Sequence, residues 1–159
     1  MREIHLSAEH LAKFQASYSK SGSCWTWNKP LDRKGYGYIY VAGRNLAAHR
    51  VALVVATGDQ LGEKLVDHIC RNRACVNPGH LRLVDHKQNG ENRAGLQRNN
   101  SSGVQGVYWD KQTSQWRGRV YHHGRHIGVG YFQSLAEAEA AVTAARKELF
   151  THNELDRAA

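Results

Sequence analysis

Long apolar runs and cysteines are both scarce in this sequence. The longest aliphatic stretch, Val51 to Ala56, has only six residues, whereas a membrane-spanning helix needs about 20. The first ten residues lack the apolar core of a secretory signal peptide, so we expect a cytoplasmic protein that is neither secreted nor bound to a membrane. Three cysteines cannot all pair within one chain, and in the cytoplasm they stay reduced.

Acidic residues are also in the minority. The 159-residue chain has 22 Lys and Arg against 14 Asp and Glu, a net charge of +8, and its 41% hydrophobic content is that of a folded protein. Residues 1–98 contain 15 basic and 8 acidic residues, residues 99–132 contain 4 and 1, and residues 133–159 contain 3 and 5. The charge favours a polyanionic partner such as a nucleic acid, and it places the basic surface in the first two regions.

Periodic patterns predict mixed secondary structure in the N-terminal part. Leu11, Phe14 and Tyr18 follow Ser7 at helical spacing, and Gly58 is suited to end the apolar helix that precedes it. The polar run at 98–103 is the best candidate for a domain boundary. The elements predicted before it are a helix after Ser7, a strand over 35–40, a turn over 42–45, a helix over 46–56, a strand over 64–68 and a helix from Asp85 to about 96.

The last third of the chain predicts a small sheet with one helix. Strand-like segments over 105–109, 115–122 and 125–132 are followed by Ser134, which forms a capping-box pattern with Glu137. We expect a tight turn between the last two strands. The sequence therefore predicts an α+β protein with two domains, residues 1–98 and residues 99–159.

Cysteine and histidine side chains recur at regular intervals. Cys70, Cys75 and His80 are five residues apart, and thiolates with an imidazole are the ligands that zinc prefers in closed, four-coordinate structural sites. Cys24 is the only cysteine left for the fourth position, and His68 is an alternative that the spacing does not exclude. The other interpretation is a set of buried thiols beside a surface histidine. A zinc site would add folding free energy that so small a domain needs.

The run around these residues resembles a known nuclease family. Over about residues 24–93 it is similar to the HNH homing endonucleases of the ββα-metal (His-Me finger) superfamily, in their zinc-bearing phage type. The motifs are Ala48-His49-Arg50, Val66-Asp67-His68, Cys70 with Cys75, Asn77-Pro78-Gly79-His80-Leu81 and Asn89. The resemblance implies a zinc-bound ββα-metal finger nuclease domain, in which Cys24, Cys70, Cys75 and His80 match the zinc ligands. Asn77 is expected to brace its loop rather than to catalyse.

The resemblance also implies catalytic roles. His68 matches the family's general base, Asn89 matches a ligand of the catalytic cation, and Asp67 matches a second ligand of that cation. Such oxygen ligands suit Mg²⁺ or a similar divalent ion, and a neutral histidine can accept a proton from water near neutral pH. We expect Arg50, and after it Arg93, to contact the scissile phosphate, or else to position phosphates elsewhere along the DNA.

The C-terminal segment resembles a second family, the DNA-binding domain of the APETALA2 plant transcription factors, which also occurs in phage homing endonucleases. The matching residues are Gly106-Val107-Tyr108-Trp109, Trp116-Arg117-Gly118-Arg119-Val120, Val129-Gly130-Tyr131-Phe132 and the alanine-rich helix 136–145. The resemblance implies a sheet that lies in the major groove, and strand alternation puts Arg117, Arg119 and Tyr121 on one face. The expected DNA contacts are Tyr108, Arg117, Arg119, Tyr121 and Arg125. The alternative is a packing module with a solvated basic face.

Together these patterns predict a metal-dependent endonuclease that hydrolyses phosphodiester bonds in double-stranded DNA. It would be of the homing type found in phages and mobile elements, acting in a bacterial or phage-infected cell with a structural Zn²⁺ and a catalytic Mg²⁺ or similar ion. One alternative is a non-catalytic, zinc-stabilised DNA-binding regulator, and another is a structural zinc module that binds proteins. Asp67, His68 and Asn89 separate the nuclease from the regulator, because a pure DNA binder needs none of them. No pattern in the sequence predicts the oligomeric state.

Overall fold

The computed structural model describes residues 3–92, 95–154 and 156, and it divides into two units, Met1–Asp85 and His86–Ala159. This division lies earlier in the chain than the predicted boundary between residues 98 and 99. The assignment of residues 1–98 to a nuclease domain therefore stays a prediction, and each unit is described by itself. Within the described ranges, no helix is long and apolar enough to cross a membrane.

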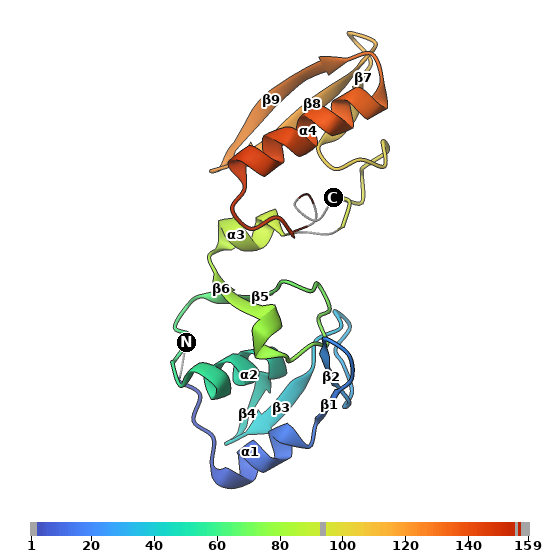
Figure 1. Ribbon diagram of the computed structural model, residues 1–159. Coiled ribbons are helices and arrows are strands. Elements are labelled where there is room, and N and C mark those ends of the chain that lie inside the picture. Colours follow the sequence, from blue (N-terminus) through green and yellow to red (C-terminus); the bar gives the residue numbers. More distant parts are fainter. Residues whose placement is uncertain (1–2, 93–94, 155, 157–159) are drawn as a thin grey trace. The chain divides into compact units, whose positions relative to one another are not determined.

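The first unit combines short helices with antiparallel hairpins (Figure 1). Its elements are α1 (Ala8–Gln15), β1 (Tyr18–Lys20), β2 (Trp25–Trp27), β3 (Tyr38–Val41), β4 (Arg44–Ala47), α2 (Ala48–Thr57), β5 (Leu65–His68), the 3₁₀ turn η1 (Pro78–His80) and β6 (Leu81–Val84). The strands pair as three two-stranded antiparallel sheets, β1–β2, β3–β4 and β5–β6. Ser7 caps α1 by accepting a hydrogen bond from the His10 amide, which confirms the predicted start of that helix.

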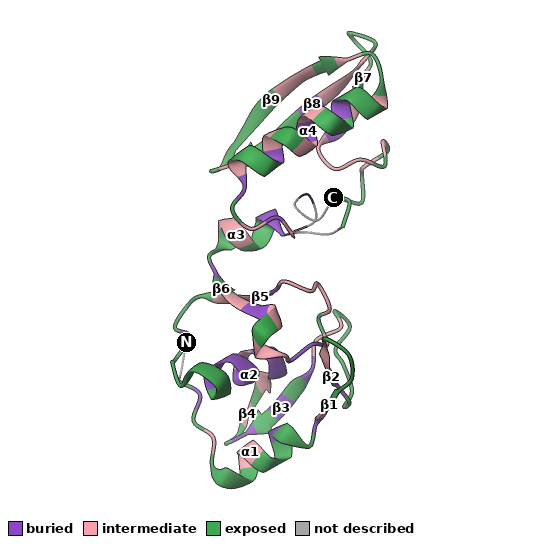
Figure 2. Ribbon diagram, viewed as in Figure 1, coloured by how far each residue is buried: buried purple, intermediate pink, exposed green. Residues whose placement is uncertain are grey.

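Helix α2 forms the centre of the first unit's core. Six of its ten residues are buried, as Figure 2 shows by its purple colour, and all of them except His49 pack with apolar side chains that include Phe14, Trp27 and Ile39. Gly58 ends the helix at a φ of 76°, as predicted. The helix begins at Ala48 rather than at 46, because the two residues before it pair with β3, so β4 runs directly into α2.

The β5–β6 hairpin carries the Asp67-His68 pair. Asp67 lies opposite Arg82, and His68 lies opposite Leu81. Strand β5 agrees with the prediction over 64–68, whereas β6 was not predicted, because its four residues, Leu81–Val84, are too few to show a clear alternation of polar and apolar side chains. Leu81 and Val84, at its two ends, are buried, so this strand is held by packing at both ends.

The second unit is a three-stranded sheet packed on one helix. Its elements are α3 (His86–Glu91), β7 (Val107–Asp110), β8 (Gln115–His122), β9 (Arg125–Phe132) and α4 (Leu135–Leu149). The antiparallel order β7-β8-β9 and the Ser134–Glu137 capping box of α4 confirm the predictions for this segment. Helix α3 is shorter than the predicted range 85–96: it ends at Glu91, and residues 93–94 lie outside the described part of the chain.

The face of the sheet that meets α4 is closely packed. Val107, Val120, Ala138 and Val142 form its core. At Gly118 a Cβ atom would lie only 2.8 Å from Cγ2 of Val142, so this glycine permits the approach of α4 to β8. The other face of β8 is open: Arg119 and Tyr121 are exposed, while Gly118 and Val120 are buried. This confirms the two faces predicted from strand alternation.

Candidate metal centre and active site

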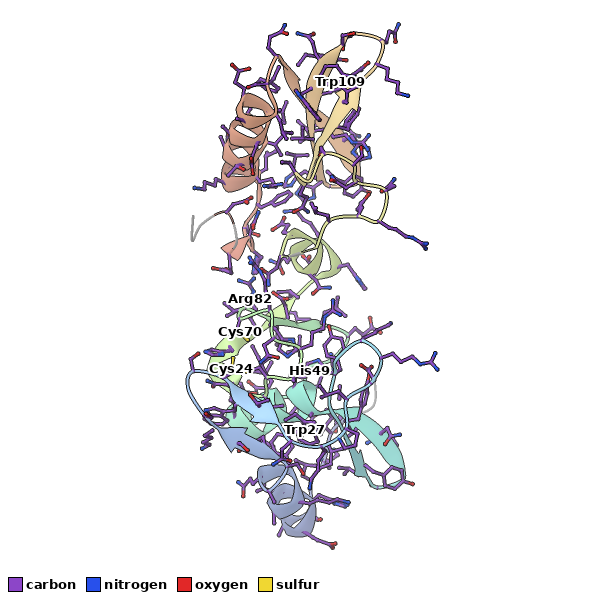
Figure 3. The ribbon with its side chains drawn as sticks, turned by 90° about the vertical axis from the view of Figure 1, so that its right-hand side faces the viewer. Cys24, Trp27, His49, Cys70, Arg82 and Trp109 are labelled. Carbon is purple, nitrogen blue, oxygen red and sulfur yellow. The ribbon has the colours of Figure 1, made fainter. Side chains whose placement is uncertain are left out.

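Three cysteines and one histidine of the first unit come together, although one of them, Cys24, is 46 residues before the next, Cys70. Cys24 precedes β2, Cys70 and Cys75 lie in the loop after β5, and His80 ends η1. Their ligand atoms all lie within 4.8 Å of one another, and Figure 3 shows Cys24 and Cys70 side by side. This group resolves the sequence alternative at the fourth position in favour of Cys24, because His68 is not a member of it.

The geometry and chemistry of this group fit a tetrahedral zinc ion. The Sγ atoms of Cys24 and Cys75 are each 3.6 Å from Nδ1 of His80, and sulfur and nitrogen ligands of one tetrahedral zinc ion are separated by about 3.6 Å. Burial raises the pKa of the Cys70 thiol to about 12 and also raises that of Cys75. Several thiolates become stable at such a place only beside a cation.

Asn77 braces the loop that carries these ligands. Its side chain accepts a hydrogen bond from the Gly79 amide at 3.0 Å and donates one to the Ser23 carbonyl at 2.7 Å. The first bond caps the N-terminus of η1, and the second connects η1 to Ser23, the residue before Cys24. The predicted bracing role of Asn77 is therefore confirmed.

His68 ends β5 in a buried aromatic cluster next to the metal-binding group. It is 5% exposed, and its ring centre lies 4.8 Å from that of His49 and 5.9 Å from that of Tyr36. Burial lowers the pKa of His68 and lowers that of His49 to about 3. His68 is therefore neutral at neutral pH, and a neutral imidazole has one donor and one acceptor nitrogen.

The hydrogen bond between His68 and the backbone of Cys75 selects the tautomer of His68. Nε2 lies 3.0 Å from the carbonyl oxygen of Cys75, and a carbonyl oxygen only accepts, so Nε2 carries the hydrogen. Nδ1 is then the ring's proton acceptor. The backbone of a metal-binding residue thus orients the histidine that the sequence predicts as the general base.

Asp67 is paired across the hairpin with an arginine that sequence reasoning missed. Its Oδ2 accepts a hydrogen bond from Nε of Arg82 at 3.1 Å and forms an ion pair with a terminal nitrogen of the same guanidinium at 3.0 Å. Asp67 directly precedes His68 in β5, so this ion pair is next to His68 in the chain. Figure 3 labels Arg82. Only the β5–β6 register reveals this partner, because Asp67 and Arg82 are 15 residues apart.

The other residues predicted to take part in catalysis are Arg50, Asn89 and Arg93. Arg50, on α2, donates to the carbonyl oxygen of Lys64 at 2.8 Å, which fixes it to the start of β5. Asn89 is exposed on α3, which belongs to the second unit, whereas His68 belongs to the first, so their pairing stays a prediction. Arg93 lies outside the described residues.

Four of the five predicted DNA-binding side chains, Tyr108, Arg117, Arg119 and Tyr121, share the open face of the second unit's sheet. The Arg119 guanidinium lies 4.8 Å from the centre of the Tyr108 ring, and Arg117 lies over Tyr108 and Tyr131 at 5.9 and 5.2 Å. Tyr121 is 60% exposed and packs against His126 at 5.0 Å. Arg125 is exposed at the start of β9, but it pairs with His122, whose ring stacks on Phe150 on the α4 side of the sheet. Tyr131 was missed as a member of this face. The cross-strand pairing of Tyr108 with Arg117 and of Arg117 with Tyr131 places it there.

A hollow of about 790 Å³ in the second unit joins this face to α3. Its lining includes Lys87 and Asn89 from α3 and Tyr108, Arg119 and Tyr121 from the sheet. Cationic, aromatic and amide side chains of both elements thus surround one concave surface.

Comparisons with known proteins identify the class to which these features belong. A model of the family described as HNH endonuclease matches residues 46–91, the stretch that contains α2, the β5–β6 hairpin and α3. The chain belongs to the HNH endonuclease family.

Three relatives are proteins of Escherichia phage T7. Protein 3.8 is 32% identical over 117 residues, which cover 74% of this chain and 93% of that protein. Protein 2.8 is 34% identical over 71 residues and Protein 7.7 is 35% identical over 68 residues, each match covering 43% of this chain. The match spans about half the length of these two relatives, 48% and 52%. No solved structure gives a significant match.

Proposed function

We propose that this protein is a metal-dependent endonuclease that hydrolyses phosphodiester bonds of double-stranded DNA, with His68 as its general base. The observation that carries the proposal is the state of His68 within an HNH family motif. It is neutral, it is held by Nε2 on the Cys75 carbonyl, and Nδ1 is its acceptor for a proton from the attacking water.

Each of the other proposed residues prepares or assists that step. Cys24, Cys70, Cys75 and His80 hold a structural zinc ion and so fix the loop whose carbonyl orients His68. Asp67 and Asn89 hold a Mg²⁺ or similar ion, which supplies neutralisation of charge on the phosphate and the leaving oxygen. Arg82 neutralises and orients Asp67, and Arg50 or Arg93 contacts phosphates of the DNA.

The open face of the second unit's sheet holds the substrate in this proposal. Its resemblance to the APETALA2 DNA-binding domain and its cationic and aromatic side chains support this role. Arg117 and Arg119 on this face, together with Arg125 at the start of β9, neutralise phosphates or contact base edges, and Tyr108, Tyr121 and Tyr131 add contact area. A sequence-reading module attached to a nuclease supports the homing type of endonuclease in a phage or mobile element.

The decisive experiment compares His68→Ala with wild type on supercoiled plasmid, with Mg²⁺ or with EDTA. We expect wild type to give nicked or linear products only with the cation, and His68→Ala to give none while it keeps its zinc content and DNA affinity. His5→Ala is the matched control, since this histidine is highly exposed. Undiminished cleavage by His68→Ala would refute the assignment of the base. DNA binding by wild type without any cleavage would instead favour the zinc-stabilised regulator.

A further inference from the structure

The last residue of α3, Glu91, is held by the segment that follows α4. Its side chain is only 3% exposed. Its Oε2 accepts hydrogen bonds from the Thr151 amide at 2.9 Å, the Thr151 hydroxyl at 3.2 Å and the His152 amide at 3.0 Å. Its Oε1 pairs with Nζ of Lys87, one turn earlier in α3, at 2.9 Å. Figure 1 shows the chain beyond α4 running beside α3.

The segment that holds Glu91 is itself built into the second unit. Phe150 belongs to the apolar core of this unit. Further along, Asp156 receives two hydrogen bonds from the buried Arg146 of α4, at 2.6 and 3.0 Å. The same guanidinium donates to the Gln105 carbonyl at 2.8 Å. Glu91 therefore joins α3 to the body of the sheet-and-helix module.

Helix α3 needs such an anchor. It has six residues, one of them Gly90, and helices shorter than about 12 residues are not stable by themselves in water. Asn89 and Glu91 are two positions apart, so they point to roughly opposite sides of the helix. Glu91 is accordingly buried and Asn89 is exposed, although both residues contribute to the lining of the hollow next to the sheet.

We propose that Glu91 is a positioning residue for cleavage: it fixes α3 on the C-terminal module so that Asn89 is presented to the catalytic cation. This inference rests on the proposed function, in which Asn89 is a ligand of that cation. Its consequence is that the module supplies more than affinity for DNA. The open face of the sheet, which would hold the DNA, and α3, which would hold the cation, then belong to one rigidly connected unit. Both of them line the same hollow.

The test compares Glu91→Ala with Glu91→Gln. The glutamine keeps an amide oxygen that can accept the bonds from Thr151 and His152, whereas alanine removes all of them. We expect Glu91→Ala to lower the maximal cleavage rate and to raise the half-saturating Mg²⁺ concentration by about tenfold or more. DNA affinity measured in EDTA and zinc content should stay within about twofold, and Glu91→Gln should restore most of the rate. The control Glu139→Ala removes a carboxylate from an exposed position of α4 and should match wild type.

The outcomes separate this inference from the function on which it rests. A wild-type protein that cuts no DNA refutes the proposed function. A cleaving wild type with unchanged rate and Mg²⁺ dependence in Glu91→Ala overturns the positioning role. A loss of DNA affinity that parallels the loss of cleavage also overturns it. If Glu91→Ala fails to fold, Thr151→Val decides, because it removes only the hydroxyl donor: a raised Mg²⁺ requirement supports the inference, and an unchanged one overturns it.

Discussion

His68 is oriented by the backbone of Cys75, because its Nε2 donates to the Cys75 carbonyl oxygen over 3.0 Å. Cys75 is at the same time one of the four side chains of the candidate metal centre. The candidate base and the candidate zinc site are thus separated by one hydrogen bond. Changes at the metal centre are expected to reach the base through this bond.

Loss of one member of the candidate zinc site should unfold the first unit selectively. We expect Cys24→Ser to release zinc and to abolish amide-exchange protection in residues 3–85, while residues 95–154 stay protected. The reason is the size of the binding free energy. A structural zinc ion contributes about 10 kcal/mol or more to the folding of small zinc domains, which is comparable to the whole free energy of unfolding of a domain. Hydrogen exchange followed by mass spectrometry measures both units at once. Ser21→Ala, at an exposed position nearby, is the control, and full protection of a zinc-free Cys24→Ser protein would contradict the structural role.

The buried His49 should make the first unit sensitive to acid. Burial lowers the pKa of His49 from the ordinary value of 6.5 to about 3. Below pH 6.5 the unfolded chain therefore binds a proton that the folded chain does not, so stability is lost as the pH falls from 6.5 towards 3. At pH 5 the loss amounts to about 2 kcal/mol.

Two measurements test this expectation for His49. In NMR titrations its ring signals should stay constant between pH 8 and pH 5 in the folded protein and should shift in urea. Urea unfolding at pH 7 and pH 5 should show a larger stability loss for wild type than for His49→Gln, and the acid sensitivity of the metal centre cancels in this comparison. Ring signals that titrate with a midpoint near 6.5 would refute a neutral, buried His49.

The contact between β8 and α4 predicts a specific effect of a single methyl group. Gly118→Ala would place a Cβ 2.8 Å from Val142 and 3.3 Å from Val129, so α4 must move away from the sheet. We expect a loss of about 1–3 kcal/mol in the stability of the second unit, measured by urea unfolding. At Gly128, in the neighbouring strand β9, a Cβ would meet nothing within 4 Å. Gly128→Ala is therefore the matched control, and equal effects of the two changes would contradict the packing described.

The open face of the sheet predicts how DNA binding depends on salt. Arg119→Gln should weaken binding and reduce the slope of log affinity against log salt concentration by about 1, if Arg119 neutralises one phosphate. Lys147→Gln removes the same charge from α4, which covers the other face of the sheet, and should leave the slope unchanged. Fluorescence anisotropy at several salt concentrations measures both, and equal slopes for the two variants would argue against the open face as the DNA surface.

Local sequence signals predicted the features that short-range patterns determine. Ser134 and Glu137 predicted the start of α4, and Gly58 predicted the end of α2. The regular spacing of Cys70, Cys75 and His80 predicted three members of the metal-binding group. Each depends on residues close together in the chain. The choice of Cys24 over His68 as the fourth member needed the fold, because Cys24 is 56 residues from His80.

The features that the sequence did not predict depend on pairing between distant segments. Arg82 became a partner of Asp67 only through the register of a strand that was not foreseen, and Tyr131 joined the open face only through its pairing with Arg117. Glu91 looked like an ordinary helix residue, and its partners lie 60 and 61 positions later. Long-range contacts of this kind leave no local pattern, because the residues next to Glu91 in the sequence carry no information about partners that lie so far away.

The direct passage from β4 into α2 has a geometric consequence. No residue separates Ala47, the last of the strand, from Ala48, the first of the helix, so the β3–β4 hairpin fixes the rotation of α2 about its own axis. One inserted residue at this junction would turn every side chain of the helix by about 100°. His49 would then leave the ring of His68, and the apolar side of α2 would leave the core. The number of residues at this junction therefore determines which side chains of α2 face the core. An insertion or deletion here is expected to be as disruptive as the replacement of a core side chain.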